Sequence, residues 1–131
     1  MKQIVVLGGG ISGYGSAILA KKKGFGVFLS DAGRIADRYK AKLDEWEVPY
    51  EEGGHTEERI LAATEVVKSP GIPDTAPMVR KIREAGIPVI SEMEFAGRYM
   101  GKAKCICITG SNGKTTTTAL IYKIMRDAGL N

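Results

Sequence analysis

The chain has 131 residues, of which 44% are hydrophobic and 26% charged, a composition typical of a globular protein and unlike that of a disordered chain. Its formal net charge of +4 is unevenly spread: residues 1–101 carry fourteen basic and fourteen acidic side chains, whereas residues 102–131 carry five basic side chains and one acidic one. A local excess of this kind suits a polyphosphate better than a duplex, so we expect no nucleic-acid partner.

The first half of the chain alternates short apolar runs with amphipathic stretches. The β-branched run Gln3–Leu7 is followed by three glycines, and Ile35, Tyr39, Leu43 and Trp46 recur at helical spacing further on. These patterns predict strands at 3–7, 27–30 and 48–50 and helices at 14–23 and 35–47.

The same alternation continues beyond residue 50. Thr56, Thr75 and Ser91 each stand where a helix cap is expected, and a Pro- and Gly-containing turn at 69–73 ends an apolar run. We predict a short helix after Thr56, strands at 65–68 and 88–90, and helices at 75–86 and 92–99.

Alternating strands and helices predict an α/β fold with a Rossmann-like parallel sheet flanked by helices. We assign this domain to residues 1–98. Residues 99–131 are predicted to be a linker and the start of a second α/β domain, with a strand at 103–109, a phosphate-binding loop and a helix at 114–128. A phosphate loop needs acidic metal partners from a neighbouring strand, so we expect this second domain to be truncated at Asn131.

Two features predict a cytoplasmic protein with no membrane partner. The apolar run at 4–7 is too short for a signal sequence or a membrane span. Cys105 and Cys107 are too close in sequence for an ordinary disulfide and have no second Cys/His pair for zinc, which favours buried thiols in a reducing compartment.

The spacing Gly8-x-Gly10-x-x-Gly13 lies between a predicted strand and a predicted helix, and Asp31 ends the next strand. Glycines there permit close approach of a diphosphate to the backbone, and the acid can bind a ribose hydroxyl. The motif indicates a diphosphate ligand without identifying it, and a tight turn that needs glycine for conformational reasons is the alternative.

The second glycine loop is Gly110-Ser111-Asn112-Gly113-Lys114-Thr115, which follows a predicted strand and opens a predicted helix. Backbone amides at a helix start bind phosphate, Lys114 adds a positive charge, and the Thr115 hydroxyl can bind Mg²⁺. A nucleoside triphosphate is the natural ligand of such a loop.

Three further positions have a structural and a functional interpretation. Ser69-Pro70-Gly71 should lie at the carboxyl edge of the sheet beside the first glycine loop. Two interpretations are open to an equal degree: contact with a ligand, or an ordinary turn. His55 has no assignable carboxylate partner, which favours a solvated loop residue over a catalyst. Glu92 and Glu94 point to opposite sides of a helix and are interpreted as solvated surface.

Two phosphate loops about one hundred residues apart resemble the pattern of the Mur ligases of bacterial peptidoglycan synthesis. The resemblance spans the whole chain and is carried by residues 8–13, 30–31, 68–72 and 108–118. The short second loop is specific to this superfamily, and folylpolyglutamate synthases, which share it, place it near their start.

The resemblance implies a role for each matching residue. The first domain would hold the uridine diphosphate (UDP) of a muramoyl substrate, and the second would bind ATP and Mg²⁺. A hydroxyl residue often follows the aspartate in this family, whereas this chain has Ala32. The implied UDP residues are Gly8, Gly10, Ile11, Ser12, Gly13, Asp31, Arg34, Ser69 and Gly71, and the implied ATP residues are Gly110, Ser111, Asn112, Gly113, Lys114, Thr115 and Thr116, with Lys114 and Thr115 catalytic and Thr115 a magnesium ligand.

The implied reaction is amide formation through an acyl phosphate. ATP would phosphorylate the carboxylate of UDP-N-acetylmuramoyl-L-alanine, and the amine of D-glutamate would displace phosphate. Because the remaining metal ligands and the amino-acid domain would follow Asn131, the 131 residues alone are expected to be inactive.

Two other functions remain open at this point. A nicotinamide-dependent oxidoreductase would account for Gly8–Gly13 and Asp31 but not for the second phosphate loop. A ligand-sensing Rossmann module would use its C-terminal helix to dock a partner. The apolar stripe between Leu120 and Ala128 also predicts that the chain self-associates through that helix.

Overall fold

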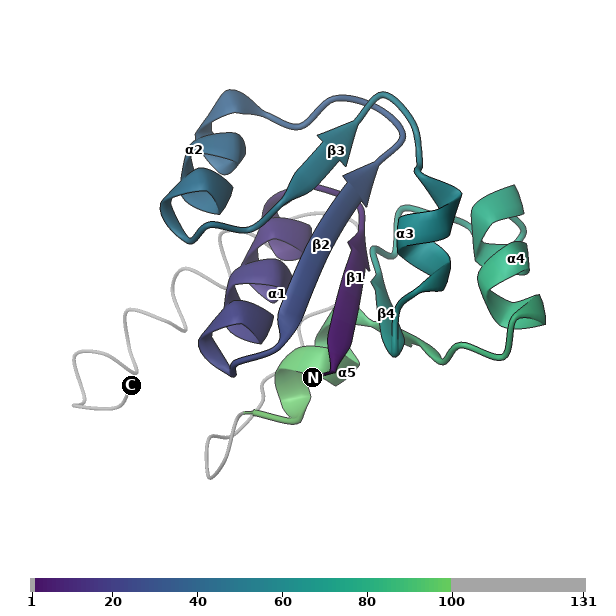
Figure 1. The fold of residues 1–131 in the computed structure, drawn as a ribbon. Helices are drawn as coiled ribbons and strands as arrows, with labels where there is room; N and C mark the ends of the chain where they lie inside the picture. The colour runs from purple at the N-terminus through teal and green to yellow at the C-terminus, as the bar shows by residue number, and fades with distance from the viewer. Residues whose placement is uncertain (1, 100–131) are drawn as a thin grey trace, which may run out of the picture. The chain divides into compact units, whose positions relative to one another are not determined.

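The computed structural model describes residues 2–99, and Figure 1 shows their arrangement. Contacts divide the chain into two units, Met1–Met100 and Gly101–Asn131, of which the first contains the described residues. Strands and helices alternate throughout, as the sequence predicts. In chain order they are β1 (Gln3–Leu7), α1 (Ile11–Lys22), β2 (Gly26–Asp31), α2 (Asp37–Glu45), β3 (Tyr50–Glu52), α3 (Glu57–Leu61), β4 (Glu65–Lys68), α4 (Pro77–Glu84), β5 (Val89–Ser91) and α5 (Glu92–Gly97).

The strands form one parallel sheet in the order β3-β2-β1-β4-β5. The central strand β1 pairs with β2 on one side, where Leu7 lies opposite Ser30, and with β4 on the other, where Leu7 lies opposite Lys68. The predicted α/β class and parallel sheet are confirmed. The chain reverses its direction of winding between β1 and β4, which is where open parallel sheets bind ligands.

Alternate residues of the strands supply two separate cores. Ile4 and Val6 of β1 face a cluster that includes Ala17 of α1, Leu43 of α2 and Phe95 of α5. Val5 and Leu7 face the opposite way, into a cluster with residues of α3 and α4. The sheet is therefore covered on both faces (Figure 1), which explains why the central strand β1 is continuously apolar from Ile4 to Leu7.

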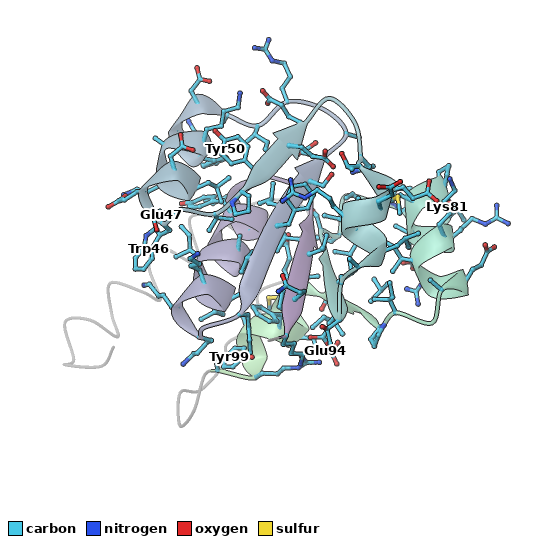
Figure 2. The ribbon with its side chains drawn as sticks, in the orientation of Figure 1. Trp46, Glu47, Tyr50, Lys81, Glu94 and Tyr99 are labelled. Atoms are coloured by element: carbon cyan, nitrogen blue, oxygen red, sulfur yellow. The ribbon has the colours of Figure 1, made fainter. Side chains whose placement is uncertain are left out.

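Several element boundaries differ from the predicted ones. α1 begins at Ile11, directly after the glycines, because the backbone turns from the loop into the helix without a spacer. α2 ends before Trp46 and Glu47, which are labelled in Figure 2. Glu47 adopts a left-handed backbone conformation with φ 55°. β3 runs from Tyr50 to Glu52 instead of 48–50.

Only one of the three predicted cap side chains caps its helix. The Ser91 hydroxyl accepts a hydrogen bond from the Glu94 amide at the start of α5. Thr56 precedes α3, but its hydroxyl donates to Glu51 instead. The cap of α4 is Ala76, not Thr75, because Pro77 occupies the first helical turn.

None of the helices in the described part is long and apolar enough to cross a membrane. The predicted second phosphate loop at 110–116, the two cysteines and the predicted helix at 114–128 lie outside the described residues, so the predictions made for them stay predictions.

Candidate functional site

Every strand ends at the same edge of the sheet, and the segments that follow the strands meet there. The glycine loop follows β1, Asp31 ends β2, and the turn that begins at Ser69 follows β4. The Ser69 amide donates to the Leu7 carbonyl at 3.0 Å, and the Gly8 amide donates to the Ser30 carbonyl at 2.9 Å. The edge of the sheet thus holds the loop and the turn side by side.

The fold places different demands on the three glycines of the motif. Gly8 has φ +102°, which other residues rarely adopt. A Cβ at Gly13 would lie 1.8 Å from the Gly8 carbonyl oxygen, so only glycine allows α1 to pack this close to the loop. Gly10 has an ordinary backbone, with φ −76° and ψ −167°, and a Cβ there would meet nothing within 4 Å. Folding therefore requires glycine at 8 and 13 but not at 10.

Asp31 fastens the loop through its carboxylate. Oδ2 accepts a hydrogen bond from the Gly9 amide at 2.8 Å, and Oδ1 accepts one from the Gly33 amide at 2.8 Å. The side chain reaches from the end of β2 across to the loop after β1. Each carboxylate oxygen keeps a second acceptor position, so Asp31 can hold the loop and still accept a ligand hydroxyl.

The turn after β4 is held by Lys68. Its ammonium donates to the carbonyl of Ile72 at 2.6 Å and to that of Ser69 at 3.3 Å, and it lies 3.6 Å from Asp74. A Cβ added to Gly8 would lie 2.8 Å from the Ser69 Cβ, which shows how closely the turn approaches the glycine loop.

A cavity of about 620 Å³ opens where these segments meet. Its lining includes the charged side chains Asp31, Glu57 and Lys81, and apolar residues of the turn and of the start of α4. Lys81 of α4, visible in Figure 2, lines the cavity and forms an ion pair with Glu57 of α3 at 2.9 Å. The lining residues are Gly8, Gly9, Gly10, Asp31, Ala32, His55, Glu57, Ser69, Gly71, Ile72, Ala76, Pro77, Met78 and Lys81.

His55 is linked to a carboxylate, that of Glu51, through the hydroxyl of Ser30, and the sequence does not reveal this link. Its Nδ1 lies 2.6 Å from the Ser30 hydroxyl, which also lies 2.7 Å from Glu51 Oε1. Because a hydroxyl has one proton and an ionised Glu51 can only accept, Ser30 donates to Glu51 and accepts from His55 Nδ1–H. The imidazole is thereby oriented at the wall of the cavity, and His55 is a loop residue as predicted, but it is half-buried and not fully solvated.

The order Glu51–Ser30–His55 is not that of a hydrolytic triad, in which the imidazole lies between the two oxygens. Ser30 is also 0% exposed and cannot reach a substrate. Burial alone would raise the pKa of Glu51, but hydrogen bonds from Thr56 and Ser30 and the neighbouring His55 hold that pKa below its usual value. The cluster is an orienting device for His55.

A second cavity of about 510 Å³ lies on the other side of the turn, between α1 and α5. Ser12 and Ser16 of α1 line it, together with Pro70 and the buried Glu92. Glu92 is 7% exposed, so the prediction that it belongs to the solvated surface is wrong for this residue, whereas Glu94 is exposed as predicted. Helical spacing alone does not reveal that α1 covers Glu92.

The predicted UDP residues thus fall into distinct places. The first cavity brings together Gly8, Gly10, Asp31, Ser69 and Gly71. Ser12 lines the second cavity, Gly13 is buried beneath the loop, and Ile11 is 69% exposed at the start of α1. Arg34 is exposed and lines neither of these two cavities.

Sequence reasoning missed His55, Glu92 and the contribution of α4 to the wall. His55 and Glu92 both come soon after strands end, at β3 and β5, and that position is the signal that could have identified them. Nothing in the spacing of Met78 and Lys81 distinguishes them from ordinary helix surface. The described residues contain no group of three or more side chains that could hold a metal ion.

Sequence comparison finds close relatives. The chain is 64% identical over 131 residues to a UDP-N-acetylmuramoylalanine–D-glutamate ligase of Bacteroides fragilis and 57% identical over 128 residues to that of Porphyromonas gingivalis. All of this chain is matched in the first case and 98% in the second, but the match covers only 29% and 28% of those relatives.

Comparison with solved structures agrees on the fold. A murein peptide ligase from Psychrobacter arcticus matches 98% of this chain and 27% of its own length, with a TM-score of 0.76 and 26% identity. A UDP-N-acetylmuramate–alanine ligase from Thermotoga maritima matches with a TM-score of 0.69 at 24% identity, which supports the fold alone.

A family model described as the N-terminal domain of MurD-like Mur ligases matches residues 2–91, which include the glycine loop, Asp31 and the turn after β4. This match covers well over half of the chain and all five strands. The chain therefore belongs to the MurD-like Mur ligase family, and residues 2–91 are its N-terminal domain.

Proposed function

We propose that the described residues bind the uridine diphosphate group of UDP-N-acetylmuramoyl-L-alanine, as part of a cytoplasmic ATP-dependent ligase that adds D-glutamate to it. The observation that carries this proposal is the open backbone at Gly10 beside the 620 Å³ cavity. A glycine that folding does not require, placed at the mouth of a cavity, leaves room for a ligand to approach the main chain.

The chemistry of the cavity suits a nucleoside diphosphate. The first turn of α1 has no side-chain cap and no acidic residue, so its amides are available to an anion. Asp31 offers acceptor positions for a ribose hydroxyl, and the apolar wall that includes Ile72 and Met78 offers a surface for a base. Ile11, Ser12 and Arg34 lie outside this cavity, and their contact with the ligand remains part of the proposal.

The catalytic half of the proposal concerns residues outside the described part. Gly110, Ser111, Asn112, Gly113 and Thr116 would surround the phosphates of ATP, while Lys114 would neutralise charge on the transferred phosphoryl group and Thr115 would bind Mg²⁺. Bound ATP and Mg²⁺ would supply the activated phosphoryl group for acyl phosphate formation. The chain spans only 29% of its Bacteroides fragilis relative, which supports the view that further residues are needed for the reaction.

Calorimetric titration of the chain with UDP tests the binding half. We expect saturable binding that weakens at least about tenfold in Asp31→Asn, because the amide keeps only one acceptor oxygen while two backbone amides compete for it. Asp44→Asn, on the last turn of α2, is the matched control and should bind like the wild type. Equal affinity in Asp31→Asn and the wild type would contradict the assignment of Asp31.

NADH distinguishes the oxidoreductase alternative. The proposal requires that NADH does not compete with UDP for the first cavity. If NADH bound saturably and UDP did not affect that binding, a nicotinamide-dependent oxidoreductase would be favoured over the ligase. For the catalytic half, phosphate release that depends on D-glutamate, measured on a polypeptide extended beyond Asn131, should disappear in Lys114→Ala.

A further inference from the structure

Glu92, the first residue of α5, is a buried carboxyl group at the ligand-binding edge of the sheet. The residue is 7% exposed, and its Oε1 atom is buried without a hydrogen-bond partner in the described part of the chain. Burial of an ionised, unpaired carboxylate is costly, so native proteins rarely retain one. A group in this position is expected to be neutral in at least one functional state.

The carboxyl lies against the first turn of α1. Its Oε1 would be 3.7 Å from a Cβ at Gly13, and Ser12 lines the same 510 Å³ cavity as Glu92. The start of α1 is also where the glycine loop presents its amides. A negative charge on Glu92 therefore lies near the same helix start as an anion bound at the loop and repels that anion.

The charges around Glu92 are few. α1 contributes Ser12, Gly15, Ser16 and Leu19 to the cavity, none of which is charged, and the turn contributes Pro70. The positive charge of Lys68 on β4 lowers the pKa of Glu92. The Lys68 ammonium is already bound to two carbonyl oxygens and lies near Asp74.

The remaining charged groups on and after α5 point elsewhere. Glu94 is exposed (Figure 2), and Arg98 is paired with Glu65. Burial raises the pKa of the Glu92 carboxyl, and the nearby Ser12 hydroxyl and the charge of Lys68 only partly oppose the rise.

We propose that Glu92 is a positioning residue for the first turn of α1 and that it carries a proton whenever an anion occupies the glycine loop. The inference rests on the proposed function, because it takes a nucleoside diphosphate as the anion. The proton comes from solvent and adds to the Glu92 carboxylate, and no other bond forms or breaks. A neutral carboxyl keeps its place against Ser12 without repelling the ligand.

The sign of the pH dependence follows from linkage. A bound diphosphate is a like charge that disfavours the carboxylate, so the pKa of Glu92 is higher in the complex than in the free protein. Between these two values the complex binds more protons than the free protein. Ligand binding therefore takes up a proton there, and affinity falls as pH rises through the window, by up to about tenfold per pH unit.

The test is calorimetric titration with UDP-N-acetylglucosamine between pH 5 and 8, in buffers of different ionisation enthalpy. Its diphosphate is a diester and does not titrate in this range, so measured proton uptake belongs to the protein. We expect uptake of a substantial fraction of one proton in the wild type and less in Glu92→Gln, which mimics the neutral acid and should still bind. Glu94→Gln, an exposed glutamate on the same helix, should behave like the wild type.

The difference in proton uptake between the wild type and Glu92→Gln isolates the share that belongs to Glu92. Uncharged uridine should cause no uptake through Glu92. Equal uptake in both proteins would overturn the role of Glu92 and leave the proposed function standing. Failure of the wild type to bind would overturn both.

A direct measurement covers the case in which Glu92→Gln does not fold. The ¹³C shift of the Glu92 carboxyl, followed against pH in the wild-type chain, reports its pKa with and without ligand. A rise in that pKa on binding supports the proposal, and an unchanged pKa contradicts it.

Discussion

Gly10 and Gly13 lie three positions apart, yet the structure demands glycine at only one of them. Gly13 is closed in by the Gly8 carbonyl, whereas Gly10 faces open space. The spacing identified both as a motif but could not say which glycine serves the fold and which serves the ligand. That distinction depends on how closely α1 approaches the loop, which spacing does not report.

The two glycines should respond oppositely to alanine. Gly10→Ala should change the free energy of unfolding by no more than about 1 kcal/mol, since its backbone is ordinary, while weakening UDP binding at least about tenfold. Gly13→Ala should destabilise the fold by about 3 kcal/mol or more, because the methyl group would overlap main chain. Thermal unfolding and calorimetry on both variants check this, and unaltered UDP affinity in Gly10→Ala would argue against an anion at the loop.

At the scale of elements, Glu51 joins three of them. It lies on β3, accepts from Ser30 of β2 and accepts from Thr56 at the start of α3. A neighbouring carboxylate, Glu52, accepts from the Ile35 amide and forms an ion pair with Lys40. This edge of the sheet is therefore organised by hydrogen bonds to two consecutive acids, although β3 itself is only three residues long.

The Glu51 cluster makes stability depend on pH. The pKa of Glu51 is lower in the folded than in the unfolded protein, so its contribution is fully present above the unfolded value, about 4.3, and is lost as pH falls through the folded value. We expect Glu51→Gln to lower the free energy of unfolding by about 1–2 kcal/mol at pH 7. Below about pH 4 the difference in unfolding free energy between the variant and the wild type should become smaller. Denaturant unfolding measured from pH 7 to pH 3 decides it, and a constant difference would show that ionised Glu51 has no special role.

The elements themselves were largely predictable, since runs such as Val5–Leu7 and Val66–Val67 are apolar on both sides of the strand and the sheet is covered on both faces. Helix starts were less so. α1 begins inside a glycine-rich stretch with low helix propensity, where tertiary packing overrides local preference. Likewise, Glu92 and His55 gain their surroundings from α1 and β2, which are remote in sequence, and local patterns do not encode such contacts.

At the scale of the whole molecule, residues 2–99 contain the five-stranded sheet and the helices that cover it. Both faces of the sheet are covered, and described residues line both cavities. A protein ending at Met100 should therefore keep its unfolding temperature within a few degrees and its UDP affinity within about twofold of the 131-residue chain. Parallel thermal and calorimetric measurements test this, and loss of binding on shortening would move part of the site to residues 101–131.

The turn at Ser69–Gly71 contributes to both cavities: Ser69 and Gly71 line the larger one and Pro70 lines the smaller one. Two weak fragments, one resting against Met78 and the other against Leu19, could thus be joined by a short tether that crosses the proline. Joining them makes the second association intramolecular, and the gain in avidity follows from effective concentration without any new contact. A linked inhibitor should therefore carry its linker across the turn, at Pro70.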